Sequence, residues 1–403
     1  MSPQRDVLSF NPHDASLFVA ERRETVFAHL RECDSLYVDS NCDVPIYSLV
    51  RYADVERAYK EPDVFSPCAG LTLDAFDPAS SDSLSKMLET APPDRHRALR
   101  NAMQAGFRGD ALDEIRADIE GRLGRFLTAA TGGGAVEFVG AFAQDAGTAM
   151  MTSLLGLAAE ERERLAPALR AIGEVDFGAS PESASRRQRT EFLLLRGLAR
   201  AVRADRKAGR SRGLIGLLLA AEIDGQPLSD QEVALNCFNV AMAGTGASQH
   251  TLAGAAAVWA EHPAALAGAG EDLKLRRRLV DETLRWLSPV IHLTRILTAE
   301  VEISGQRLPK GAGVCLWNIS ANRDESVFED PPAFDPDRPP ARNLAFGAGP
   351  QYCLGAEIVR AQLDALLTGL ARHGARFELA GPPGWMASNA IAGVESLPLR
   401  VRR

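Results

Sequence analysis

The sequence lacks features typical of nucleic-acid-binding, membrane-spanning and secreted proteins. Aromatic residues make up only 6% of its 403 residues, and Lys and Arg (45) are outnumbered by Asp and Glu (53), giving a net charge of −8. This acidic balance argues against nucleic acid as the main partner. No stretch approaches roughly 18 apolar residues, so we expect no membrane span. The first residues lack the apolar core of a signal peptide, so we expect a cytoplasmic protein.

The cysteines do not form a recognisable metal or disulfide framework. There is no CxxC pair, and the spacings give no zinc pattern. So few cysteines in a chain of this size do not indicate a disulfide scaffold, so a reducing compartment is expected. The six are Cys33, Cys42, Cys68, Cys237, Cys315 and Cys353.

Helical patterns predominate over strand patterns. Ala, Leu, Arg and Glu recur at a spacing near 3.6 residues through the middle of the chain, and shorter stretches alternate as strands do. We therefore predict a mainly α protein with smaller β regions, one unit over 1–403 without a reductase domain. Helical parts are predicted near 93–290 and 354–373, β-rich parts near 36–60, 291–318 and 376–402, and a long loop over 66–90.

One helix is predicted to be long and buried. Ser229 or Asp230 offers a good N-cap. The residues after it are apolar on most faces for roughly 30 residues, which is typical of a helix enclosed by the rest of the protein. We therefore expect a central helix here.

The segment FGAGPQYCLG, residues 346–355, presents one cysteine among three glycines before an amphipathic helix. A helix N-terminus offers unpaired N–H groups and the positive end of the helix dipole, and both stabilise a thiolate. Glycines permit positive φ and close approach of a flat partner, and Phe346 can shield the sulfur. A lone thiolate fits an axial haem ligand better than zinc. A buried structural cysteine in a glycine-rich turn would show the same pattern.

Three other segments accompany the cysteine loop. They are ETLRWLSPVIHLTR, PPDRHRALRNAMQAGF and AFDPDR. Together the four resemble, in the right order, the signatures of the cytochrome P450 family of haem-thiolate monooxygenases: the ExxR helix, the helix with His and Arg four residues apart, the proline-rich meander and the cysteine loop. The resemblance implies the P450 fold, with haem between a long central helix and the helix after the cysteine loop.

The resemblance also implies haem b, with Cys353 as the iron ligand. His96, Arg100 and Arg295 resemble the family's propionate-binding residues, and guanidinium forks suit carboxylates. Taken alone, His96 and Arg100 would read equally well as a solvated pair. Gln351 stands where histidine is common and carries no positive charge, so one propionate is expected to be less neutralised. The other haem contacts implied are Phe346, Gly347, Gly349, Gly355 and Ala356.

Glu282 and Arg285 are predicted to form a structural ion network with Arg338. The first two are three residues apart and share a helix face. A lone pair of this kind is usually exposed on a surface. Its position just before Pro289 and the meander favours burial, and buried charges of this kind are costly unless they are paired.

The central helix lacks the acid and the alcohol that usually relay protons in this family. Gly246 stands at the acid position and Ala247 at the alcohol position, and neither side chain carries a proton. Three alternatives stay open: Thr245 or Ser248 supplies a hydroxyl from an adjacent step of the helix, the substrate brings its own proton donor, or the enzyme makes little use of oxygen insertion. The dioxygen groove is assigned to Ala243, Gly244, Gly246, Ala247 and Ser248.

The missing relay leads us to favour oxidative C–C or C–N coupling or cyclisation of a small, aromatic or cyclic-dipeptide-like natural product. Ordinary hydroxylation with a substrate or water relay, peroxide-driven chemistry and a non-catalytic haem binder are the alternatives. Electrons are expected from a ferredoxin or flavodoxin with its reductase, docking at a positive patch of Arg97, Arg100 and Arg360. The implied substrate pocket contains Asn239, Val290, His292 and Ile391.

Overall fold

Twelve α-helices are found among the described residues of this computed structural model, which are 10–33, 35–40, 42–79, 84–130, 132–173, 181–223, 225–339 and 341–403. The predicted loop 66–90 therefore lies partly outside them, at 80–83. The helices are α1 (Ala20–Glu32), α2 (Tyr52–Lys60), α3 (Pro93–Met103), α4 (Asp110–Ala129), α5 (Gln144–Leu155), α6 (Ala159–Gly173), α7 (Pro181–Ala208), α8 (Gly213–Leu219), α9 (Asp230–Glu261), α10 (Leu273–Leu287), α11 (Asn318–Ala321) and α12 (Ala356–Arg372).

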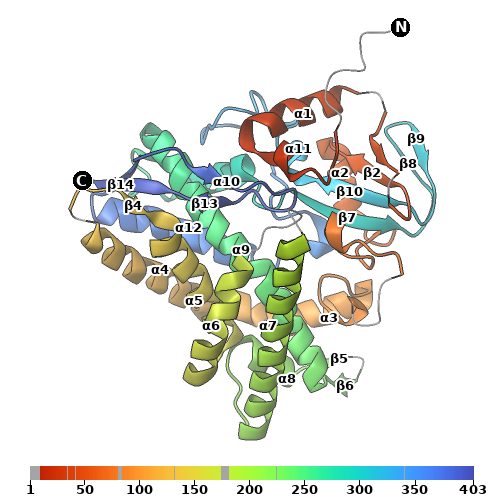
Figure 1. Cartoon of the computed structure of the whole chain (residues 1–403), viewed down its shortest axis with the longest axis horizontal. Coiled ribbons are helices and arrows are strands. Elements are labelled where there is room, and N and C mark those ends of the chain that lie inside the picture. The colour runs from red at the N-terminus through yellow and green to blue at the C-terminus, as the bar shows by residue number, and fades with distance from the viewer. Residues whose placement is uncertain are drawn as a thin grey trace.

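The strands form small sheets beside the helices (Figure 1). The five-stranded sheet has the order β1-β2-β10-β7-β3, in which only β2 and β10 run parallel. Its strands are β1 (Val38–Asp39), β2 (Ile46–Leu49), β3 (Phe65–Ser66), β7 (His292–Leu297) and β10 (Gly313–Trp317). The remaining strands are β4 (Val136–Glu137), β5 (Glu222–Ile223), β6 (Gln226–Pro227), β8 (Val301–Ile303), β9 (Gln306–Leu308), β11 (Arg376–Leu379), β12 (Gly384–Trp385), β13 (Val394–Ser396) and β14 (Pro398–Arg402).

The mainly α fold with smaller β regions is confirmed, with one correction near the N-terminus. The β-rich part predicted over 36–60 ends at β2, because the chain forms helix α2 from Tyr52. Val55, Ala58 and Tyr59 are buried on one side of that helix. Their spacing of three and four residues is helical, and a strand could not bury all three on one face.

Helix α9 runs through the middle of the helical part (Figure 1) and contacts α5, α6, α7, α10 and α12. Ser229 caps it in a capping box with Glu232, whose side chain accepts from the Ser229 N–H over 3.0 Å. All residues from 248 to 259 are buried. The middle of the helix differs, because Ala243 is exposed there. The centre of the central helix is therefore accessible at this position.

No helix among the described ranges combines the length and the apolar character that crossing a membrane requires. The longest apolar helix, α9, carries Asp230 and Glu232 in its first turn and is enclosed by other helices.

Candidate active site

The cysteine loop turns through two left-handed backbone conformations before α12 begins. Gly347 and Gly349 both have φ of 68°, which glycine adopts without the clash that a Cβ causes. The N–H of Cys353 donates to the carbonyl of Phe346 over 3.0 Å, and Gly355 is the N-cap of α12. The loop thus presents Cys353 at the amino end of this helix.

Gly349 is also a point of close approach to α2. A Cβ there would lie 2.6 Å from the carbonyl oxygen of Tyr59 and 3.0 Å from the Cα of Lys60. Because these are backbone atoms, we expect Gly349→Ala to cost about 2–4 kcal/mol of stability and to lower haem content, as measured by urea unfolding and by haem quantification. Gly311→Ala is the matched control, because Gly311 has φ of 86° and open space around it. Equal losses in the two variants would contradict a role for the contact.

Cys353 is exposed in the structure, yet burial raises the pKa of its thiol to about 11. Both observations hold for a side chain that protein surrounds on most sides and that keeps some accessible surface. The N–H of Gly355 and the guanidinium groups of Arg100 and Arg360 favour the thiolate and so oppose this rise. A Cβ on Gly355 would meet the Cys353 sulfur at 3.9 Å and no other described residue within 4 Å. The space beside the sulfur can therefore accept a flat ligand.

Two arginines near the cysteine have unused hydrogen-bonding capacity. Arg295 donates from Nη1 to the carbonyl of Thr294 over 2.7 Å and from Nη2 to Oε1 of Gln351 over 3.1 Å. Its buried Nε has no hydrogen-bond partner among the described residues. Arg100 is half-buried, and its side chain makes no hydrogen bond or ion pair to any part of the chain that the structure describes. Donors of this kind fit an anion such as a carboxylate.

Gln351 and His96 connect these groups to the cysteine loop. Gln351 carries no charge, but it accepts a hydrogen bond from Arg295 and so orients that cation. His96 is buried, with Nδ1 2.7 Å from the carbonyl oxygen of Leu88 and Nε2 3.4 Å from that of Pro350. The histidine therefore joins α3 to the cysteine loop and is not the solvated side chain that its spacing alone would allow.

The structure brings Glu282, Arg285 and Arg338 together. Arg285 donates to both carboxylate oxygens of Glu282 over 2.7 Å. Nε of Arg338 lies 3.6 Å from Oε1 of Glu282, and the three side chains are 9% exposed or less. The N–H of Asp335 donates to the same carboxylate over 2.9 Å. This buried network fastens α10 to the proline-rich meander.

Neither hydroxyl near the middle of α9 is free. Thr245 is buried and donates to a carbonyl one turn earlier in its own helix, over 2.8 Å. Ser248 is buried and donates to Oε1 of Gln362 on α12, over 2.9 Å. A Cβ on Gly246 would lie 3.6 Å from the Cα of Gly173 in α6. Ser248 therefore faces α12, in place of the predicted groove, and Gly246 lies close to α6.

The other residues predicted to line the groove also differ in whether they pack against another helix or keep accessible surface. A Cβ on Gly244 would lie 2.6 Å from the methyl group of Met151, so this glycine allows α5 to pack closely. Ala243 is exposed and Ala247 is half-buried. The open surface of the helix thus carries alanine methyl groups, and no titratable side chain replaces the missing relay at positions 243–248.

His292, predicted to lie in the substrate pocket, is buried and bonded within the protein. The N–H of Leu73 donates to its Nε2 over 3.0 Å, and its Nδ1 lies 2.8 Å from the carbonyl oxygen of Asn389. Burial lowers the pKa of His292 to about 4, so the ring is neutral. Both ring nitrogens therefore hold two loops against β7, and neither is free to bind a substrate in this arrangement.

The remaining pocket residues keep accessible surface and bring in one residue that sequence reasoning missed. Val290 and Ile391 pair in an isolated antiparallel bridge, and both are half-buried. Asn239 donates to Oε2 of Glu89 over 2.7 Å. Glu89 lies in the loop before α3. The available signal was an acidic residue within the long loop 66–90, seven residues before His96.

Comparison with known proteins decides the family. A family model described as Cytochrome P450 matches residues 268–379. The chain is 31% identical over 360 residues to the cyclomarin C epoxidase CymV of Salinispora arenicola, an alignment that covers 89% of this chain and 91% of that protein. The chain belongs to the cytochrome P450 family. It is therefore a P450 oxidoreductase with a haem iron cofactor, and the P450 fold is confirmed.

Three further comparisons agree, the first two with the family and the third with the fold. This P450 is 29% identical over 383 residues to cytochrome P450 NovI of Streptomyces niveus, over 94% of this chain and 93% of that one. Among solved structures, P450 OxyD superimposes with a TM-score of 0.84 at 25% identity, over 97% of this chain and 99% of that one. A Mycobacterium marinum cytochrome P450 in complex with pseudoionone gives a TM-score of 0.85 at 24% identity, over 98% of each chain.

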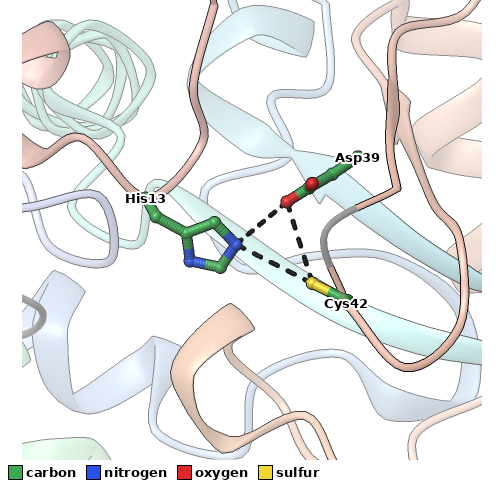
Figure 2. Close-up of side chains that lie close together, drawn as sticks. All are labelled: His13, Asp39 and Cys42. Carbon is green, nitrogen blue, oxygen red and sulfur yellow. Dashed lines mark hydrogen bonds and ion pairs between the residues drawn. The ribbon is translucent and has the colours of Figure 1, made fainter.

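A second cluster of chemically capable side chains lies away from this site, beside β1 (Figure 2). Nε2 of His13 lies 3.0 Å from Oδ2 of Asp39 and 3.9 Å from the sulfur of Cys42. The carboxylate and the thiol face the same ring nitrogen, so the imidazole does not bridge them as the base of a nucleophilic triad does. A hydrogen bond from His13 to Asp39 accounts for the arrangement, which joins the N-terminal segment to β1.

Proposed function

We propose that this P450 oxidises a small natural product over a haem b whose iron is bound by the Cys353 thiolate. The observation that carries the proposal is the exposed residue Cys353 at the start of α12, with open space at Gly355 beside it. Two of the similar proteins have names connected with natural products. CymV is named as the epoxidase of cyclomarin C, and OxyD is described as involved in the biosynthesis of vancomycin-type antibiotics.

The residues around the sulfur fit a haem. Arg100, with its unused donors, and Arg295, with its orphaned Nε, would hold the propionates, and Gln351 would keep Arg295 in place. His96 would support this side from α3. When bound, a haem with a thiolate ligand supplies dioxygen activation, because the thiolate favours O–O cleavage. The thiolate face would be lined by Phe346, Gly347, Gly349, Gly355 and Ala356.

The reaction class that we propose is oxidative coupling or cyclisation of an aromatic or cyclic-dipeptide-like substrate. In such a reaction two substrate X–H bonds are oxidised, one bond forms between the two atoms, and dioxygen leaves as water with electrons from a redox partner. Support comes from the middle of α9. The side chains of Gly246 and Ala247 cannot relay a proton, and the hydroxyls of Thr245 and Ser248 are engaged elsewhere. Protons must then come from water or from the substrate.

Product analysis under isotopically labelled dioxygen tests this reaction class. A substrate would first be found by spectral titration with cyclic dipeptides, indoles and polyketides. We expect the main product to contain no label, because dioxygen is released as water. Label in the main product would contradict coupling and would support oxygen insertion, the class to which the named reaction of CymV belongs. Ala247→Thr adds a hydroxyl at the half-buried alcohol position. If the reaction is oxidative coupling, this variant should change neither the product nor the fraction of consumed electrons that appears in product.

We further propose that a ferredoxin or flavodoxin with its reductase supplies electrons at the face beside the cysteine loop. Arg97 is 71% exposed and offers a guanidinium to an acidic partner, although Asp94 lies 3.1 Å from it. Arg360 stacks on Phe346 at 4.9 Å and pairs with Asp281 over 2.8 Å. The positive patch is therefore partly neutralised within this chain, and Arg97 is its accessible member.

A further inference from the structure

A half-buried carboxylate and an amide stand together beside the open face of the central helix. Nδ2 of Asn239 donates to Oε2 of Glu89 over 2.7 Å. Asn239 precedes the exposed Ala243 by one helical turn, so both lie on one face of α9. The charge of Glu89 also acts on the Cys353 thiol, whose pKa it raises, and on Arg295. The pair therefore borders the site that we propose for substrate and haem.

The backbone around Glu89 is fixed by contacts on both sides. Asn236 accepts from the N–H of Leu88 and donates to the carbonyl of Lys86, each over 2.9 Å. Nδ1 of His96 contacts the carbonyl of Leu88 at 2.7 Å. The carboxylate is thus held at a set place between α9 and α3, as a recognition group must be.

The charge of Glu89 is not met within the described part of the chain. Burial raises the pKa of its carboxyl, and the Asn239 amide and the more distant Arg295 only partly oppose this. None of the ion pairs among the described residues includes Glu89, and Oε1 makes no hydrogen bond to them. Oε1 is not fully enclosed by protein and keeps some accessible surface. A partly desolvated carboxylate gains most from a cationic partner.

Arg295, the cation that acts on Glu89, forms no ion pair with it, and the free Nε of Arg295 is assigned above to a haem propionate. Arg295 spends Nη1 on Thr294 and Nη2 on Gln351 and lies over the ring of Tyr59 at 5.6 Å. Ala243, one helical turn after Asn239, is exposed and apolar. A ligand at this place therefore meets one anionic oxygen, one amide and an alanine methyl group.

We propose that Glu89, positioned by Asn239, binds a protonated primary or secondary amine of the substrate. The inference deepens the proposed function and rests on it, since it places this amine in the pocket of the same haem site. The ammonium group would donate to Oε1 of Glu89, and the side-chain oxygen of Asn239 would accept a second N–H. The substrate class becomes an aromatic or peptide-like compound with a basic nitrogen.

Calorimetric binding to the haem-loaded full chain tests this subsite. The probes are phenethylamine and its neutral counterpart 2-phenylethanol. We expect the wild-type protein to prefer the amine, and Glu89→Gln to weaken amine binding roughly tenfold to a hundredfold while the alcohol changes less than about twofold. Glu89→Asp should recover part of the preference. Glu300→Gln, at an exposed position between β7 and β8, is the matched control and should bind as the wild type does.

Several outcomes overturn the subsite. They are equal wild-type affinities for the two probes, no binding of either, or an unchanged amine preference in Glu89→Gln. If Glu89 instead moves protons for the reaction, Glu89→Gln will keep the amine affinity and lower only the fraction of consumed electrons that appears in product. That result also overturns the subsite. The spectrum of the reduced protein with carbon monoxide distinguishes failure of the subsite from failure of the proposed function. A normal thiolate band with no amine preference defeats the subsite alone, whereas a missing band in the wild type defeats the proposed function.

Discussion

Reduced Cys353→Ser protein is expected to bind carbon monoxide without the red-shifted Soret band of thiolate ligation, and its turnover should fall to background. Serine keeps the shape of the side chain but loses the anion, because an aliphatic hydroxyl stays protonated where a thiol at a helix N-terminus can lose its proton. The donor that favours O–O cleavage is then absent. Difference spectroscopy measures the band, and haem content is determined separately so that loss of ligand and loss of haem are distinguished.

Cys68→Ser supplies the matched control for this result. Cys68 is exposed, as Cys353 is, but it follows β3 and no helix begins at it. This variant should keep the band and the turnover of the wild type. A Cys353→Ser protein that retained the thiolate band would show that the sulfur comes from another residue, and the proposed haem site would then have to be abandoned.

The sequence predicts best where a short segment contains its own physical reason. The glycines of the cysteine loop, the N-cap at Ser229 and the spacing of Glu282 and Arg285 act over a few residues, and the structure shows the turns, the helix start and the ion pair at those places. The family resemblance extended this reach, because it connected Arg338 with an ion pair more than fifty residues earlier.

The sequence predicts less well where a side chain finds its partner across the fold. Asn239 and Glu89 are 150 residues apart, and nothing near either residue specifies their contact. His292 is polar on a strand, which reads as a pocket residue, yet loops from both ends of the chain occupy its two nitrogens. Ser248 likewise finds Gln362 on α12. Register and burial decide such pairings, and neither is visible in a single sequence.

Arg285→Ala is expected to cost about 3–5 kcal/mol of unfolding free energy, the largest loss in stability that we predict for this chain. The change leaves the Glu282 carboxylate buried, with Arg338 only at 3.6 Å. It also removes the donors to the carbonyls of Asn322 and Pro331, each at 2.9 Å. Typical proteins have only about 5–15 kcal/mol in total, so poor folding and low haem loading should accompany the change. Urea unfolding followed by circular dichroism measures it.

A second substitution separates the charge from the packing. If the cost comes from an uncompensated carboxylate, adding Glu282→Gln to Arg285→Ala should restore part of the stability, because the buried group is then neutral. If lost packing dominates, the double variant will be no better than the single one, and the ionic explanation is wrong. Arg116→Ala breaks an exposed pair of the same i, i+3 spacing, with Asp113, whose side chains are 41% and 77% exposed. It should change stability by less than about 0.5 kcal/mol, so the burial of Glu282 would account for the difference.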